Sequence, residues 1–195
     1  KVLPFGKGKS YGDACLNKEG QLISLKNISK ILDLDQENGE IECEAGITLK
    51  QIQDLIIPLG WILPVVAGTQ FITLGGAIAN DIHGKNHLAV GSFGNSIKEL
   101  TLLKSDGIYR VCSNDENDGL FKATVGGAGL TGFIVSAKIK LKAIKSNLLE
   151  INYRNFNSFE DFEELLDKNS KSEYAVSWFN CREGKNFRGL MQIAN

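Results

Sequence analysis

Alternation of polar and apolar residues predicts most of the strands in the first part of the chain. Residues 21–25, 31–35 and 40–45 read as short strands, and the last of them, Glu-Ile-Glu-Cys-Glu-Ala, alternates at every position. Such alternation is typical of a half-buried strand. Residues 133–141 alternate in the same way, which predicts a strand with its odd-numbered apolar residues on one face. The opposite face is expected to carry Ser136, Lys138 and Lys140.

A hairpin is predicted around residues 97–111. The apolar runs 97–103 and 108–111 flank Lys-Ser-Asp-Gly, and Asp106-Gly107 is a strong signal for a tight turn between antiparallel strands.

Helices are predicted where apolar residues recur at helical spacing. Thr48 is expected to cap a helix that ends at Pro58, because threonine is a good N-cap and proline stops a helix. Thr73 is expected to cap a short helix over residues 74–80, whose first turn would offer free N–H groups. Residues 117–123 also look helical.

The pattern changes near Ala143. Residues 148–153 begin a new strand, Ser158 is expected to cap an acidic helix over residues 159–166, and residues 174–179 form another strand. The fold class is therefore predicted to be α+β.

Two domains are predicted on either side of this change. Residues 1–143 are expected to form one α+β domain, and residues 144–195 the truncated start of a second one, which has too little apolar surface to be complete. Because the chain also starts at Lys1 in the middle of a pattern, we expect a fragment of an enzyme roughly twice its size.

Composition and charge exclude several functions. The 195 residues include 22 basic and 23 acidic side chains, and the net charge of -1 offers no field for a polyanion. Nucleic acid and anionic membranes are therefore not expected as partners. No apolar run approaches the roughly 18 residues of a membrane span. We expect a cytoplasmic protein, with peripheral membrane contact only through parts outside this chain.

The four cysteines show no metal-binding or redox spacing. Cys15, Cys43, Cys112 and Cys181 lie far apart without a C-x-x-C pair, which excludes a zinc knuckle and a thioredoxin-like site. We interpret them as free, mostly buried thiols of a reducing compartment, although their spacing leaves disulfides open.

Twenty-one glycines occur in clusters, which indicates close approach of main chain to a ligand. Residues 127–132 spell G-x-G-x-x-G, but a strand follows them where a dinucleotide-binding fold needs a helix. His83 and His87 form H-x-x-x-H, but Gly84 and Lys85 between them argue against a zinc helix. No serine stands in a nucleophile elbow.

A phosphate-binding interpretation accounts for the remaining pattern. Residues 6–13 present glycines, hydroxyls and lysines whose backbone N–H groups can form an anion nest. Gly68-Thr69 and the Thr73 cap, with Gly75-Gly76, could form a second one. Such a pair suits a pyrophosphate, and a planar ring would then lie near residues 80–85.

These motifs resemble those of a known flavoprotein family. Residues 8–13, 64–69, 73–87, 91–95 and 123–132 are similar to the FAD-binding domain of the vanillyl-alcohol-oxidase-type (PCMH-type) flavoproteins. The resemblance covers residues 3–141 and implies two small α/β subdomains followed by an α+β substrate domain. Within the family the chain is similar to the flavin subunits of epimerases that act on polyprenylphosphoryl pentoses for cell-wall arabinan.

The resemblance also implies the site residues. His83 and Lys85 match residues at the substrate face of the flavin and are the predicted catalytic residues. The FAD-binding residues that it implies are Phe5, Gly6, Lys7, Gly8, Lys9, Ser10, Tyr11, Gly12, Asp13, Gly68, Thr69, Thr73, Leu74, Gly75, Gly76, Asn80, Asp81, Ile82, His83 and Ile134. No metal is expected.

Two positions depart from the family pattern. Relatives with covalently bound flavin carry a histidine where this chain has Lys9, so the resemblance implies non-covalent FAD. Asn80 stands where mycobacterial members have a cysteine, so reactions that need that thiol are not expected here.

The activity implied by the resemblance is the oxidation of a secondary alcohol of a sugar to a keto sugar, by hydride transfer to flavin N5. The substrate would be a sugar or lipid-linked sugar, and a short-chain reductase would be the partner. Two alternatives stay open: an aldonolactone or alditol oxidase that uses oxygen, and a non-catalytic flavin-binding module. On any of these interpretations, this piece alone is expected to hold FAD at best weakly and to be inactive.

Overall fold

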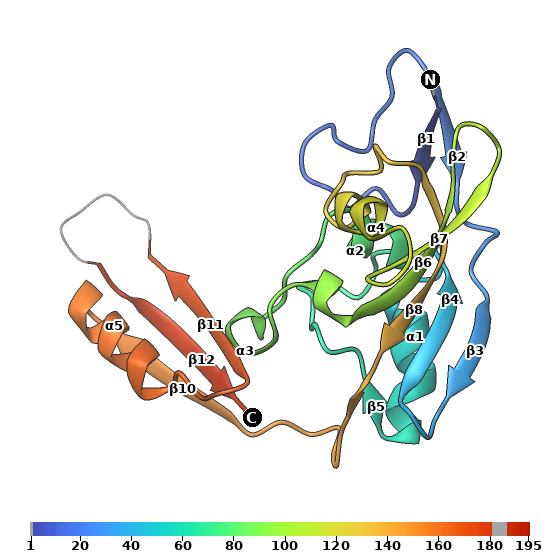
Figure 1. The fold of residues 1–195 in the computed structure, drawn as a ribbon. Coiled ribbons are helices and arrows are strands. Elements are labelled where there is room, and N and C mark those ends of the chain that lie inside the picture. The colour runs from blue at the N-terminus through green and yellow to red at the C-terminus, as the bar shows by residue number, and fades with distance from the viewer. Residues whose placement is uncertain (1, 181–186) are drawn as a thin grey trace.

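Two lobes make up the computed structural model, which describes residues 2–180 and 187–195. The first lobe contains residues 2–143 and the second residues 151–180 and 187–195, and an extended connection joins them (Figure 1). The structure confirms the α+β class, since helices and mainly antiparallel sheets alternate along the chain.

The elements follow one another with short connections. In chain order they are β1 (Val2–Phe5), β2 (Gln21–Ser24), β3 (Ile31–Asp35), β4 (Glu40–Glu44), α1 (Leu49–Ile56), η1 (Ile57–Leu59), β5 (Trp61–Ile62), α2 (Leu74–Ala79), α3 (His87–Val90), η2 (Phe93–Ser96), β6 (Ile97–Leu103), β7 (Tyr109–Ser113), α4 (Asp118–Thr124), β8 (Phe133–Lys140), β9 (Lys142–Ala143), β10 (Ile151–Phe156), α5 (Phe159–Lys168), β11 (Tyr174–Phe179) and β12 (Gly189–Ala194).

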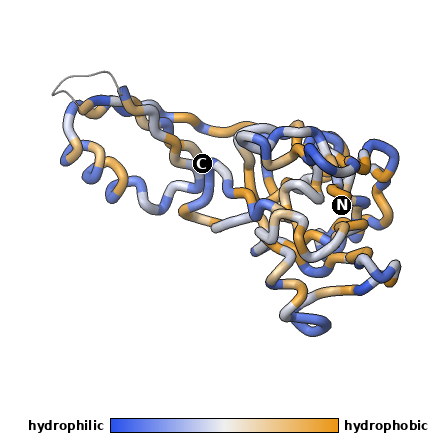
Figure 2. The backbone as a smooth tube through the Cα atoms, turned by 90° about the horizontal axis from the view of Figure 1, so that it is seen from above, coloured by the Kyte–Doolittle hydropathy of each residue, from blue (hydrophilic) through white to orange (hydrophobic). Residues whose placement is uncertain are grey.

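The core of the first lobe lies between a five-stranded sheet and its helices. The strands run antiparallel in the order β3-β4-β8-β6-β7, and α1, α2 and α4 contribute buried residues to the same hydrophobic cluster. Ile41 and Cys43 of β4 are buried while the three glutamates between and beside them are half-buried, so the predicted alternation is confirmed. Figure 2 shows the apolar segments gathered in this lobe.

A small parallel pair, β1 and β2, stands beside the main sheet. The N–H of Leu25, which is buried, bonds to the carbonyl of Phe5 at 3.0 Å and extends this pair. The N–H of Gly46 bonds to the carbonyl of Ile28 at 2.8 Å and ties the segment after β2 to the rest of the lobe. Gly46 then passes so close to the carbonyls of Leu25 and Ile28 that a Cβ atom could not fit there. The sequence did not predict β1, since its four residues carry no alternating pattern.

The predicted cap of α1 is confirmed. The Thr48 hydroxyl accepts the N–H of Gln51 at 3.3 Å, and the Gln51 side chain accepts the N–H of Thr48 at 3.0 Å. This reciprocal pair is a capping box. Pro58 lies in the 3-10 turn η1 that directly follows the helix.

A bulge in β8 changes the predicted faces of this strand. Thr101 pairs with Ser136 and Leu102 with Ile134, so Val135 has no opposite residue. One extra residue reverses the alternation, which turns Ile134 into the core and leaves Val135 half-buried. The predicted strand is confirmed, and Ser136 lies on the face opposite Ala137 as predicted, where its hydroxyl bonds to Glu42 at 3.4 Å, although it is buried there. The assignment of Val135 to the core face is wrong, because Ile134 takes that place opposite Leu102.

The second lobe is a three-stranded antiparallel sheet with one helix on it. The strand order is β10-β12-β11, and α5 covers one face through the cluster of Phe156, Met191 and Ile193. Ser158 caps α5 as predicted, since its hydroxyl accepts the N–H of Asp161 at 3.0 Å. Apolar and polar positions alternate around α5 in Figure 2.

Two strands of this lobe differ from prediction. β10 begins at Ile151, three residues later than expected, and β12 was not predicted at all. β12 lies in the centre of the sheet because it pairs with strands on both sides. Its short apolar sequence alone does not predict this pairing.

Replacing Thr48 with alanine is expected to lower the free energy of unfolding of the 195-residue chain by about 1 kcal/mol, because the capping box loses its hydroxyl. Urea unfolding followed by circular dichroism measures the difference. Thr48→Ser keeps the hydroxyl and serves as the matched control. Equal stability of the alanine and serine variants would contradict the role of the cap.

Candidate functional site

Four segments that are distant in sequence meet around α2. The N–H of Lys85 bonds to the carbonyl of Val66 at 2.9 Å, and the N–H of Phe93 to the carbonyl of Ile82 at 2.8 Å. On the other side of α2, the N–H of Gly126 bonds to the carbonyl of Ile78 at 3.0 Å. Three of the predicted glycine clusters, in residues 68–76, 84–94 and 126–132, therefore lie together around α2. The surface that they form with α2 is called the wall below.

The G-x-G-x-x-G segment contributes to this wall and not to a dinucleotide fold. It lies between α4 and β8, so a strand follows it as expected. The N–H of Ala128 bonds to the carbonyl of Ala79 at 2.8 Å, which fastens the segment to the end of α2.

The first glycine loop joins the wall at Thr73. A Cβ atom on Gly6 would run into the Thr73 side chain, so only glycine permits this close approach. Gly8 and Gly12 have φ of 59° and 60°. Within the described residues, no backbone N–H from residue 6 to residue 13 has a hydrogen-bond partner. The loop therefore presents a row of available donors, as the predicted anion nest requires.

The first turn of α2 does not offer free N–H groups, so that expectation is wrong. The N–H of Leu74 bonds to the carbonyl of Ile47 at 2.8 Å, and that of Gly75 to the carbonyl of Ala45 at 2.8 Å. The Thr73 hydroxyl, as the predicted cap, accepts the N–H of Gly76 at 3.2 Å. The cause is a tertiary contact, because the ends of α1 and α2 lie side by side across a Thr48–Thr73 bridge. Whether Thr73, Leu74, Gly75 and Gly76 contact a ligand stays a prediction.

Gly68 and Thr69 lie on an open loop next to this turn. Both are exposed, and a Cβ atom on Gly68 would meet nothing within 4 Å. The Thr69 hydroxyl accepts the N–H of Phe71 at 3.3 Å, which shapes the loop. Space beside Gly68 is consistent with a bound group there.

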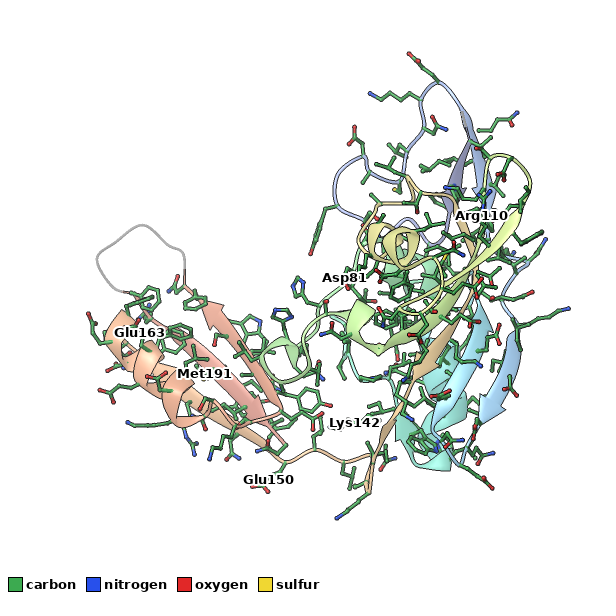
Figure 3. All side chains as sticks on the ribbon, viewed as in Figure 1. Asp81, Arg110, Lys142, Glu150, Glu163 and Met191 are labelled. Carbon is green, nitrogen blue, oxygen red and sulfur yellow. The ribbon has the colours of Figure 1, made fainter. Side chains whose placement is uncertain are left out.

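The turn after α2 is held in an uncommon conformation. Asp81 has φ of 39°, and its carboxylate Oδ1 accepts the N–H of Gly94 at 2.8 Å. Figure 3 shows Asp81 in the first lobe beside α2 and α4. Asn80 is exposed, its side chain donates to the carbonyl of Gly76 at 2.8 Å, and Ile82 packs against the core. Asp81 therefore anchors the loop that carries His83.

His83 and Lys85 are both exposed on this loop. The rings of His83 and His87 lie 5.6 Å apart at an interplanar angle of 68°. Gly84 separates the two candidates, and a Cβ atom there would collide with the backbone of Val66. Within residues 2–180 and 187–195, no three His, Cys, Asp or Glu side chains are gathered so as to hold a metal ion.

Asn86 is the buried anchor of this loop, a role that the sequence analysis missed. Its side chain is 1% exposed, accepts the N–H of Val66 at 3.1 Å and donates to the carbonyl of Pro64 at 2.7 Å. Both partners lie at least 20 residues earlier, so the sequence around Asn86 gives no sign of them.

The remaining predicted residues divide by exposure. Ile134 is buried in β8, so a ligand could reach only its main chain. Phe5 is half-buried, and the exposed members of the first loop are Lys7, Gly8, Lys9, Ser10, Tyr11, Gly12 and Asp13.

The sequence profile of the FAD binding domain family matches residues 1–113. The chain belongs to this family. It is 35% identical to the decaprenylphosphoryl-beta-D-ribose oxidase of Mycolicibacterium smegmatis over 92% of this chain and 40% of that protein. It is 28% identical to the L-gulonolactone oxidase of Mus musculus, again over 92% of this chain and 40% of that protein. The chain thus spans 40% of the length of these relatives.

A third relative is named for a different reaction. The delta(24)-sterol reductase of Homo sapiens is 31% identical over 59% of this chain and 22% of that protein. Relatives of this chain thus carry names of different reactions.

The residues of this FAD-binding domain fit the cofactor. Unpaired N–H groups of residues 6–13 can receive a pyrophosphate, and the free space beside Gly68 lies next to the Thr73 turn that the loop contacts. The wall formed by α2 and residues 80–85 continues from there and offers main chain along which a flat ring can lie.

Replacing Asn86 with alanine is expected to lower the free energy of unfolding by about 1–3 kcal/mol, because the groups of Pro64 and Val66 lose their buried partner. Thermal and urea unfolding measure this loss. Asn95→Ala is the control, since Asn95 is exposed and makes one 3.3 Å bond to Val90. A loss no larger than that of the control would refute the anchoring role.

Proposed function

We propose that this chain is part of an FAD-dependent oxidoreductase that oxidises a secondary alcohol of a sugar. The proposal rests on the unpaired N–H groups of residues 6–13, which form the predicted anion nest. This loop contacts the wall around α2, and His83 and Lys85 are exposed at the end of that wall. Similarity to oxidases named for a phosphoryl ribose and a sugar lactone supports the substrate class. We infer that the substrate is a polyprenylphosphoryl pentose.

Bound FAD would accept a hydride from the sugar carbon at N5. The chain's own contribution is positioning and proton transfer. His83 and Lys85 are exposed on one loop, so their side chains can reach a substrate hydroxyl beside the ring. The imidazole of His83 can accept the hydroxyl proton, and the Lys85 ammonium can stabilise negative charge that develops nearby.

We propose that FAD binds non-covalently. Lys9 stands in the first loop where covalently flavinylated relatives would have a histidine, and it is exposed. A protonated lysine is a poor nucleophile. Covalent attachment through this loop is therefore not expected.

The same proposal assigns FAD binding and substrate binding to different lobes. Residues 1–143 would form the FAD-binding domain and residues 144–195 the start of the substrate domain, supported by two separate buried clusters. We infer that a short-chain reductase completes an epimerisation as partner. A cytoplasmic location stays a prediction; among the described residues, no helix is both long and apolar enough to cross a membrane.

A second candidate is an aldonolactone or alditol oxidase that uses oxygen. It is favoured by similarity to the L-gulonolactone oxidase of Mus musculus, which extends over as much of the chain as the first relative does. Oxygen consumption by the complete gene product with simple polyols or lactones distinguishes this candidate from the first.

Replacing Gly68 with leucine is expected to weaken FAD binding at least about tenfold while the chain stays folded, because the new side chain fills space that the cofactor needs. Flavin fluorescence measures binding, and acid precipitation shows whether the yellow colour is released, as non-covalent FAD requires.

Gly119→Leu is the matched control for this substitution. Gly119 is also exposed with nothing within 4 Å of an added Cβ atom, but it lies in α4. Gly68→Leu is expected to change the free energy of unfolding by less than about 0.5 kcal/mol. Gly119→Leu replaces a glycine within α4 and is expected to raise it by up to about 1 kcal/mol. Equal FAD affinity of the two variants would exclude the cofactor from the Gly68 loop.

Replacing His83 or Lys85 with alanine in the complete gene product is expected to lower kcat by about 100-fold or more, because proton transfer and charge stabilisation are lost. FAD content is expected to stay unchanged in Lys85→Ala, because Lys85 is outside the predicted FAD-binding residues, and kcat is taken per bound FAD in both variants because His83 is one of them. Single-turnover flavin reduction by substrate measures the step. Unchanged turnover in both variants would remove these residues from the chemistry.

A further inference from the structure

The second lobe contacts the candidate site through the edge of its sheet. β11 lies beside α3 (Figure 1), and the N–H of Ala175 bonds to the carbonyl of Lys85 at 3.1 Å. The N–H of Lys85 bonds to Val66 in the first lobe at 2.9 Å. The main chain of Lys85 is therefore fixed from opposite sides by the two lobes.

An ion pair crosses between the lobes near this contact. Lys142 belongs to β9, which pairs with β5 in the first lobe, and its ammonium pairs with Oε2 of Glu173. Figure 3 shows Lys142 in the first lobe near the start of the connection to the second. Glu173 directly precedes β11, and its N–H bonds to the side chain of Asn195 at 2.9 Å. The ion pair thus holds β11 two residues before Ala175.

The surroundings of Glu173 make this pair stronger than an ordinary surface pair. The side chains of Lys142 and Glu173 are 38% and 27% exposed, whereas Lys168 and Glu164 of α5 are 69% and 70% exposed. Oε1 of Glu173 is buried without a hydrogen-bond partner in the part of the chain that the structure describes. A carboxylate in that position depends on its cation, because an unpaired charge away from water is costly.

We propose that Glu173 is a positioning residue for Lys85. Through its ion pair with Lys142 it holds the start of β11 against the first lobe, so that Ala175 meets the carbonyl of Lys85 and fixes the direction of the Lys85 side chain. The proposal rests on the function proposed above for Lys85, and its structural half can be measured without any turnover.

The structural half is tested by exchanging the charges in the complete gene product. Glu173→Lys and Lys142→Glu each put like charges together and are expected to speed hydrogen exchange at the Ala175 amide about tenfold. The Lys85 amide, which bonds within the first lobe, is expected to change less than about twofold. The double variant E173K/K142E restores the attraction and is expected to restore slow exchange at Ala175.

Lys168→Glu is the matched control, because it creates the same repulsion with Glu164 on an exposed surface. It is expected to leave exchange at Ala175 and Lys85 unchanged. Mass spectrometry with single-residue resolution measures all five proteins, and circular dichroism confirms that each is folded. Glu173→Gln is a milder substitute if Glu173→Lys does not fold.

The functional half is tested by the kinetic constants of the same proteins. Each single charge reversal is expected to lower kcat about tenfold with less than about twofold change in FAD affinity, and the double variant to recover kcat. Fast exchange in the double variant, or slow exchange in both single variants, would overturn the ion pair's role. Restored exchange without restored kcat would overturn the link to Lys85. Absence of any sugar oxidation in the unmodified protein would instead refute the proposed function, while the exchange data still decide the role of the pair.

Discussion

The candidate site depends on the hydrogen bonds that hold residues 83–86 against residues 64–66. Burial of these side chains does not hold the loop, since His83 and Lys85 are both exposed. The side chain of Asn86 holds the loop instead, because it accepts the N–H of Val66 and donates to the carbonyl of Pro64. Gly84 lets the two backbones approach closely enough for these bonds. Because amide bonds of this kind are directional, they fix where the two exposed side chains begin.

Burial keeps two of the described thiols from redox chemistry. Cys43 and Cys112 are buried and Cys15 is half-buried, all without a bridge, whereas Cys181 lies outside the described residues. Burial, and then the charge of Glu42, raises the pKa of Cys43 to about 12, so that thiol stays protonated. Thiols in this state are poor nucleophiles. The function proposed above therefore uses the flavin, and not these thiols, as the electron acceptor.

The sequence predicted correctly the features that depend on contacts between residues close in sequence. It did not predict the features that depend on contacts with strands distant in sequence. The caps Thr48 and Thr73 and the Asp106-Gly107 turn depend on contacts a few residues away, and all three are present. The bulge at Val135 depends on β6, more than 30 residues earlier. The N–H groups of α2 could not be predicted as occupied, since their partners follow β4. The resemblance supplied candidate residues, but Asn86 became visible only through its bonds.

The position of Lys85 explains why the two lobes matter to one another. A lysine on a loop of the first lobe alone would have its N–H fixed and its carbonyl free to turn. Ala175 removes that freedom, and Glu173 secures Ala175 through its ion pair with Lys142. Bonds to both peptide groups limit rotation about the backbone on either side of the residue. A shift of the second lobe would therefore also shift the main chain of Lys85 and, on the function proposed above, the ammonium group that would meet the substrate.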